Sequence, residues 1–194
     1  TYTGATAINR GTLQVGNGSA GLLGGGNYSK AIYNNGSLVF YNNVSDQTLS
    51  GVISGCGTLT QNGSSTLTLA GNNSYTGATA INCGTLVFNS TSNQTLSGNI
   101  SGAGNLTVAL GKIIFTGANN SYTGRTTING GATLQVGNGS AAGSLSNGNV
   151  SNYGELLFNS SANQSYAGII SGGATGTLTK EGSGRLTLTG NNTY

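Results

Sequence analysis

The sequence predicts an all-β fold, a single-stranded parallel β-helix or β-solenoid of about eight coils, each 20–28 residues long. Three observations predict it: whole phrases recur along the chain, apolar and polar residues alternate within them, and Gly or Asn separates the runs. Alternation with a period of two is typical of a strand with one buried face. Gly-Asn, Asn-Gly and Gly-Gly steps supply tight turns, so the chain can change direction between short strands.

Three phrases recur almost literally along the chain. The first occupies residues 2–9, 75–82 and 122–129, the second occupies residues 46–55, 93–102 and 163–172, and the third begins at Leu67, Ile113 and Leu186. Within the coils, the triplets 13–15, 67–69 and 186–188 alternate apolar and polar residues, and we expect each to form a strand with its apolar side chains inside.

A finer marker of the coil is the leucine of Gly-Thr-Leu and its variants. These leucines are Leu13, Leu38, Leu59, Leu86, Leu106, Leu134, Leu156 and Leu178. Their spacing of 20–28 residues is shorter and less regular than a 34-residue helical repeat and suits one coil of a solenoid. We therefore expect them to occupy equivalent positions in successive coils, with like residues stacked over like residues.

Composition excludes several classes of protein. The 194 residues include 36 Gly, only 5% charged residues, and no Pro, Met, Trp or His, which is unlike an ordinary globular enzyme. Recurrent apolar residues argue against disorder. The six basic residues are scattered singly, so we expect no nucleic-acid partner. No apolar run approaches the roughly 20 residues that cross a bilayer, so we expect no membrane insertion in this segment, and any signal or anchor would lie outside it.

The acidic residues predict that this segment is not an enzyme. Glycoside hydrolysis, which other parallel β-helices perform, needs two neighbouring carboxylates, and the chain has only Asp46, Glu155 and Glu181, at rung positions that do not converge. Without His, a Ser or Cys nucleophile has no usual base. We therefore expect no catalytic residues, no cofactor and no metal site.

The two cysteines are candidates for a disulfide. Cys56 and Cys83 both precede Gly-Thr-Leu, so the coil alignment places them at the same position in successive rungs, with Cα atoms about 5 Å apart. An oxidising extracellular setting favours a bridge, and a stacked pair of reduced thiols is the alternative. Two thiols without His make a poor zinc set.

Recurrent Tyr and Asn residues predict structural roles. Tyr2, Tyr75, Tyr122 and Tyr194 occupy equivalent sites, where a ring can cover a turn with its hydroxyl at the surface; an aromatic track for sugars is the alternative. The Asn pairs at 72–73, 119–120 and 191–192 are expected to stack as amide ladders or to bond turn backbones. A weak ligand patch is expected in the less repetitive insertion 16–43. Its residues are Tyr28, Tyr33 and Tyr41.

The phrase from Lys180 to Tyr194, followed in register by the opening Thr-Gly-x-Thr-x-Ile-Asn and Gly-Thr-Leu-Gln-Val-Gly, resembles the autotransporter-associated β-strand repeat of bacterial surface proteins. The resemblance covers essentially the whole chain. It implies a right-handed β-helix outside a Gram-negative cell, as in large adhesins or passengers of type V secretion. The handedness comes from the resemblance and not from the periodicity.

These features predict a structural shaft of an extracellular bacterial fibre, filament or autotransporter-type passenger that supports adhesion, surface display or a biofilm matrix. The alternatives are a ligand-specific adhesin for host or matrix glycans and an ice-binding solenoid. The Thr-Leu-Thr steps at 66–68 and 187–189 suggest ice binding, but residues 113–115 interrupt the matching position.

The whole chain, residues 1–194, is predicted to be one continuous solenoid without separate domains. Thr193-Tyr194 matches Thr1-Tyr2, which indicates a super-repeat of 192 residues. We therefore expect copies of the chain to join end to end, as a tandem array or a homopolymer. The alternative is a segment that stops at a repeat boundary.

Overall fold

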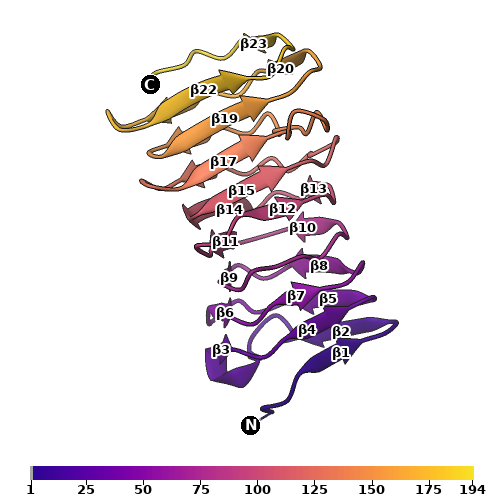
Figure 1. Ribbon diagram of the computed structural model, residues 1–194. Helices are drawn as coiled ribbons and strands as arrows, with labels where there is room; N and C mark the ends of the chain where they lie inside the picture. The colour runs from indigo at the N-terminus through magenta and orange to yellow at the C-terminus, as the bar shows by residue number, and fades with distance from the viewer. Residues whose placement is uncertain (1) are drawn as a thin grey trace.

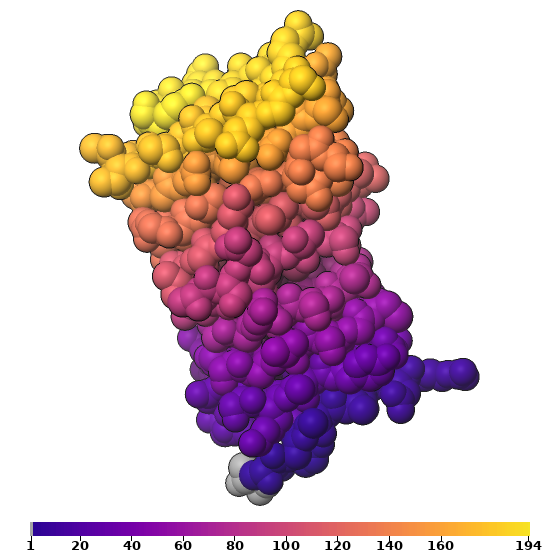
Figure 2. All heavy atoms as spheres, in the orientation of Figure 1, coloured from indigo at the N-terminus to yellow at the C-terminus, as the bar shows by residue number. Residues whose placement is uncertain are grey.

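The chain forms a rod of stacked backbone coils. In the computed structural model, which describes residues 2–194, the N-terminal and C-terminal coils lie at opposite ends of this rod (Figures 1 and 2). All named strand pairings are parallel, and the described residues contain only one short 3₁₀ turn, Gly24–Gly26. No helix within residues 2–194 is long and apolar enough to cross a membrane. The predicted all-β parallel solenoid is confirmed.

Each coil crosses three faces in the same order. The first face contains β1 (Thr6–Ile8), β4 (Ile32–Asn34), β7 (Ile53–Ser54), β12 (Gln94–Leu96), β15 (Lys112–Phe115), β17 (Thr133–Val136), β19 (Glu155–Asn159) and β22 (Thr177–Glu181). The second contains β2 (Thr12–Val15), β5 (Ser37–Phe40), β8 (Thr58–Gln61), β10 (Thr79–Ile81), β13 (Ile100–Ser101), β20 (Gln164–Tyr166) and β23 (Leu186–Leu188). The third contains β3 (Asn27–Tyr28), β6 (Gln47–Leu49), β9 (Thr66–Leu69), β11 (Thr85–Asn89), β14 (Asn105–Leu110), β16 (Thr126–Ile128), β18 (Val150–Asn152) and β21 (Ile170–Gly172).

The third face is one eight-stranded sheet, which agrees with the predicted number of coils. Thr193 begins a further level through an isolated bridge to Ser171. The first and second faces are each interrupted where the chain is extended but not paired as a strand. Residues 73–76 extend the first half of the first face through backbone bonds to Ile53 and Gly55, and the backbone N–H of Asn73 donates to Gln94 Oε1 in β12 of the second half. Residues 120–123 extend the second face through bonds to Ile100 and Gly102.

The alternating residues place one side chain inside and the next outside. In β9, Leu67 and Leu69 are fully buried, whereas Thr66 and Thr68 are half-buried on the outside. Leu67 pairs with Leu86 of β11, so leucines stack directly over one another in the core. Full burial of such a side chain contributes about 1.5–3 kcal/mol relative to exposure, and the stacking repeats this gain at each level.

Glycines form a column at the corner between the first and second faces. A Cβ placed on Gly77 would lie 2.0 Å from the carbonyl oxygen of Gly57, and one on Gly98 would lie 2.1 Å from that of Gly77. The same close approach continues at Gly36, Gly57 and Gly117. Because no other residue lacks a Cβ, the corner keeps its sharp bend in each coil only with glycine. This column is one physical reason for the high glycine content.

The expected single column of equivalent leucines is wrong. Leu13, Leu38 and Leu59 stack in register on the second face, but the neighbour of Leu59 in the next coil is Thr79. Leu86 and Leu106 stack on the third face, and the neighbour of Leu106 is Thr126. The remaining leucines stack on the first face. They are Leu134, Leu156 and Leu178.

The physical reason is that the sequence repeat is longer than a whole number of coils by one face. The first repeated phrase forms β1 on the first face, β10 on the second face and β16 on the third face. The two largest spacings between the marker leucines, from Leu59 to Leu86 and from Leu106 to Leu134, therefore contain one coil plus one extra strand and corner. Each of the three copies of the phrase therefore lies on a different face of the rod.

Candidate functional surfaces

The second asparagine of each Asn pair fastens one coil to the coil below. Its Oδ1 accepts the backbone N–H of an isoleucine. The pairs are Asn73 with Ile53 at 2.8 Å, Asn120 with Ile100 at 2.7 Å, and Asn192 with Ile170 at 2.8 Å. The first asparagine of each pair is exposed. One member of each pair therefore bonds backbone, as expected, but the bonded N–H belongs to the first residue of a strand and not to a turn.

The recurrent tyrosines inside the rod are enclosed. Tyr75 and Tyr122 are almost completely buried, and their hydroxyls bond the hydroxyls of Thr79 at 2.9 Å and Thr126 at 2.7 Å. The expectation that these hydroxyls lie at the surface is wrong, because the threonine four residues later satisfies each of them inside. Burial raises the pKa of Tyr75 to about 12 and also raises the pKa of Tyr122, so both stay neutral at physiological pH.

The tyrosines of the insertion 16–43 do not form one exposed patch. Tyr28 is 2% exposed, and its hydroxyl bonds Thr6 Oγ1 at 2.8 Å inside the first coil. Tyr33 is 50% exposed on β4, and Tyr41 lies partly buried against Gly16 and Gly18. The structure therefore leaves Tyr33 as the freely exposed ring of the three.

The two cysteines are free and exposed. Cys56 lies before β8, with its backbone N–H bonded to Asn35 Oδ1 at 3.1 Å, whereas Cys83 lies after β10. Because β8 and β10 pair in register, the two cysteines lie toward opposite ends of neighbouring strands. The expected stacking was wrong because the leucine motifs that follow them occupy different faces, and the structure does not bring the thiols together.

The carboxylates are separated along the rod. Asp46 lies before β6, and its Oδ1 accepts the backbone N–H of Thr66 at 2.8 Å. Glu155 begins β19 and accepts hydrogen bonds from Thr133 and Thr179, whereas Glu181 ends β22 in the next coil. Among residues 2–194 no three His, Cys, Asp or Glu side chains lie close enough to hold a metal ion. The acids present act as local hydrogen-bond acceptors.

A row of outward hydroxyls follows the third face. Strand register stacks Thr48, Thr68, Val87, Thr107, Thr127, Ser151 and Ser171, so that one valine interrupts the hydroxyls. The neighbouring outward row is mixed, with Thr66 and Thr85 followed by Asn105. The Thr-Leu-Thr steps at 66–68 and 187–189 lie on different faces and never form one array.

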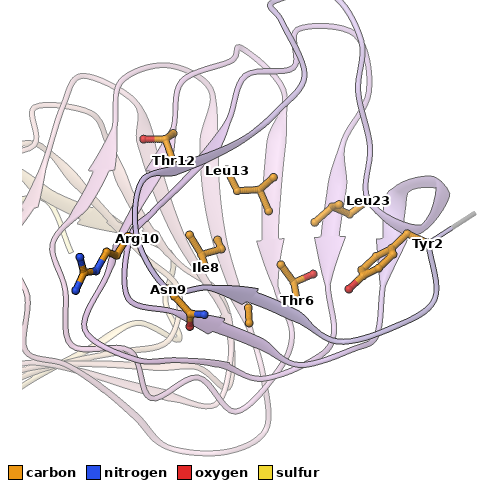
Figure 3. Close-up of a pocket in the computed structure, with 9 residues that line it drawn as sticks. Tyr2, Thr6, Ile8, Asn9, Arg10, Thr12, Leu13 and Leu23 are labelled. Atoms are coloured by element: carbon orange, nitrogen blue, oxygen red, sulfur yellow. The ribbon is translucent and has the colours of Figure 1, made fainter.

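The N-terminal end of the rod is hollowed. The hollow has a volume of about 550 Å³, and Ile8, Leu13 and Leu23 point into the space enclosed by the first coil, whereas Arg10 points away (Figure 3). At the other end, Leu178, Leu186 and Leu188 are only partly buried, although equivalent leucines inside the rod are fully buried. The two ends therefore expose the core that stacking covers elsewhere.

The three-faced stack of near-identical phrases, with its residues bonded from coil to coil, defines a β-solenoid repeat protein. A family model described as the passenger-associated-transport-repeat matches residues 1–15, 59–88, 101–136 and 178–194, just over half of the chain. The chain belongs to this family, which confirms the autotransporter-associated resemblance.

One curated relative is the adhesin BmaC autotransporter of Brucella suis biovar 1 (strain 1330). The chain is 46% identical to it over 61 residues, which is 31% of this chain and 2% of the relative. The chain therefore spans a small fraction of the length of this relative. A search of solved structures found no match.

Proposed function

We propose that the chain is a section of a rigid shaft in an autotransporter-type passenger displayed outside a bacterial cell. The observation that carries the proposal is the uninterrupted stacking of coils, because the eight-stranded third face runs along the whole rod and every level is bonded to the next. Parallel ladders of this kind resist bending and leave few unpaired backbone groups. The function of such a shaft is reach, with adhesion supported by many weak contacts along its length.

The chemistry of the surface supports a shaft more than a specific receptor. Outward positions carry mainly hydroxyl and amide side chains, and the three acids and six bases are spread along the chain. The hollow at the N-terminal end is lined by core side chains that belong to the stacking itself. The family membership and the name of the adhesin relative support a location at the cell surface or in the medium.

A ligand-specific adhesin that binds host or matrix glycans is the second candidate. The name of the relative and the exposed ring of Tyr33 on β4 favour it, because aromatic rings are amphipathic contacts at binding surfaces. An ice-binding face is less favoured, because the outward hydroxyls form one interrupted row instead of a flat array.

The shaft proposal is tested by displaying one or two copies of the chain on a bacterial surface beneath an epitope tag. Each added copy is expected to raise the tag on the order of 40 Å, from about nine levels of about 4.8 Å, which fluorescence quenching by a membrane-surface dye measures. An unchanged height rules out the rigid shaft. Saturable binding to one glycan on an array, lost in Tyr33→Ala but kept in Tyr153→Ala, would favour the adhesin instead.

A further inference from the structure

The two ends of the rod carry strand edges that no other strand within residues 2–194 covers. β22 is the last strand of its sheet on the first face, and β1 is the first strand on that same face. On the second face, β23 is likewise the last strand and β2 the first. Uncovered parallel edges present unpaired backbone N–H and C=O groups that favour pairing with another strand.

Strands of the same sequence type as β22 and β1 pair twice inside the rod. β8 carries the phrase Thr-Leu-Thr-Gln and is covered by β10, which carries Thr-Ala-Ile. β14 and β16 repeat this pairing on the third face. β22 carries Thr-Leu-Thr-Lys, and β1 carries Thr-Ala-Ile. The uncovered strands β22 and β1 therefore have the sequences of two strand types that pair with each other inside the rod.

The next strands at the two ends, β23 and β2 on the second face, also match a pairing inside the rod. That internal pairing is on the first face, where β15, with Lys-Ile-Ile-Phe, is covered by β17, with Thr-Leu-Gln-Val, so that Ile113 pairs with Leu134 and Phe115 with Val136. β23 is the third copy of the β15 phrase, and β2 has the same four residues as β17. This pairing would place Leu13 and Val15 over Leu186 and Leu188.

Side-chain contacts at the internal pairings are also available at the ends. Asn82 Nδ2 donates to Asn62 Oδ1 at 3.1 Å where β10 covers β8. The corresponding residues at the ends are Asn9 and Glu181, an amide donor and a carboxylate acceptor. Gln61 donates its amide to the carbonyl oxygen of Gly63 at 3.1 Å, and Lys180 likewise donates to the carbonyl oxygen of Gly182 at 2.9 Å.

The residues that match the family model also indicate that the two ends of the chain complete one another. It covers two internal copies of about equal length, residues 59–88 and 101–136, together with two shorter stretches, 178–194 and 1–15. The stretch 178–194 carries the strands that are covered in each internal copy, and 1–15 carries the strands that cover them. Taken in that order, the two stretches form one complete repeat.

We infer that the partner of the C-terminal coil is a second copy of this sequence, whose N-terminal coil continues the helix in register. Thr6, Ala7 and Ile8 of the second copy pair with Leu178, Thr179 and Lys180 of the first. The three copies of the first phrase lie on the first, second and third faces in turn, so the first phrase of the second copy returns to the first face, next to β22. This inference rests on the proposed shaft and names its neighbour.

The test is a two-copy chain in which residues 3–194 follow directly after Tyr194 of a first copy. Thr179→Cys in the first copy and Ala7→Cys in the second are introduced with Cys56→Ser and Cys83→Ser in both. Adjacent parallel strands lie about 4.8 Å apart, within the Cα range for a disulfide. Mild oxidation is expected to join the pair in most molecules, as read by mass spectrometry after proteolysis. The two-copy chain is also expected to unfold in one transition, at a higher temperature than the single copy.

Thr177→Cys replaces Thr179→Cys in the matched control. It lies on the same outward side of β22 but two residues away, so it is expected to stay reduced. Equal cross-linking of the control, or none in the test pair, overturns the inference. If the two introduced cysteines stay reduced while the two-copy chain is folded and each copy still raises the epitope tag, the in-register stacking of copies is wrong and the shaft proposal is retained. If the disulfide forms but the second copy does not raise the tag, the shaft proposal is wrong and the in-register stacking is retained.

Discussion

Asn73, Asn120 and Asn192 make the same bond on three different faces, each supplying Oδ1 to an isoleucine N–H of the coil below. The sequence predicts a bond of this type from the repeated pair, because Asn is a residue that bonds neighbouring backbone. It does not predict which member turns inward. That choice depends on the coil below, where the N–H of the isoleucine lies within hydrogen-bond distance of the second asparagine. The threonine partners of the buried tyrosines were missed, although they recur four residues after each tyrosine.

Asn120→Ala is expected to lower the free energy of unfolding by about 1–3 kcal/mol, because it leaves the buried N–H of Ile100 without an acceptor. It also removes the bond from Asn120 Nδ2 to the carbonyl oxygen of Ser144. Urea unfolding followed by circular dichroism measures the change. Asn119→Ala is the control, because its side chain is exposed, and it is expected to stay within about 0.5 kcal/mol of the parent. Equal losses for the two variants would contradict the assigned role.

At the level of elements, the alternating residues predict strands and their inward sides correctly. β9 and β23 contain the predicted triplets 67–69 and 186–188, and the inward positions of Leu67, Leu86 and Leu106 follow from that alternation. The corners are less predictable, because a glycine can serve a positive φ, a close approach or neither. Only the neighbouring coil decides that Gly77 meets the carbonyl of Gly57 while Gly130 meets little.

Gly77→Ala is expected to destabilise the rod by about 1–3 kcal/mol, because its Cβ would lie 2.0 Å from a backbone oxygen and the corner would have to open. Thermal unfolding of the purified chain measures the effect. Gly130→Ala provides the comparison, since its nearest neighbour would be the carbonyl oxygen of Tyr153 at 3.6 Å, an ordinary contact. A tolerated Gly77→Ala would show that the corner column is not tightly packed.

On the scale of the whole molecule, stability depends on position along the rod, because each coil is covered by the coils on either side. Leu106 is completely buried in β14, whereas Leu186 in β23 is partly buried at the C-terminal end. The same substitution therefore has different costs at the two positions.

Leu106→Ala is expected to lower the free energy of unfolding by about 2–5 kcal/mol, and Leu186→Ala by about 1 kcal/mol. Urea titration of the single chain measures both. In the two-copy chain, Leu186→Ala in the first copy is expected to approach the cost of Leu106→Ala, because a second coil then covers it. An unchanged cost in the two-copy chain would mean that this end of the rod stays uncovered.

The sequence by itself determined the solenoid and the inward side of its strands, because both depend on local alternation and on repetition that can be read along the chain. The tertiary structure alone decided which residues stack. The interval between successive copies of a phrase is longer than a whole number of coils by one face, so Cys56 and Cys83, or Leu59 and Leu86, look equivalent in sequence and lie on different sides of the rod. The reason is that the backbone closes each coil after three strands and three corners. The combined length of these strands and corners, which only the folded chain shows, sets the offset.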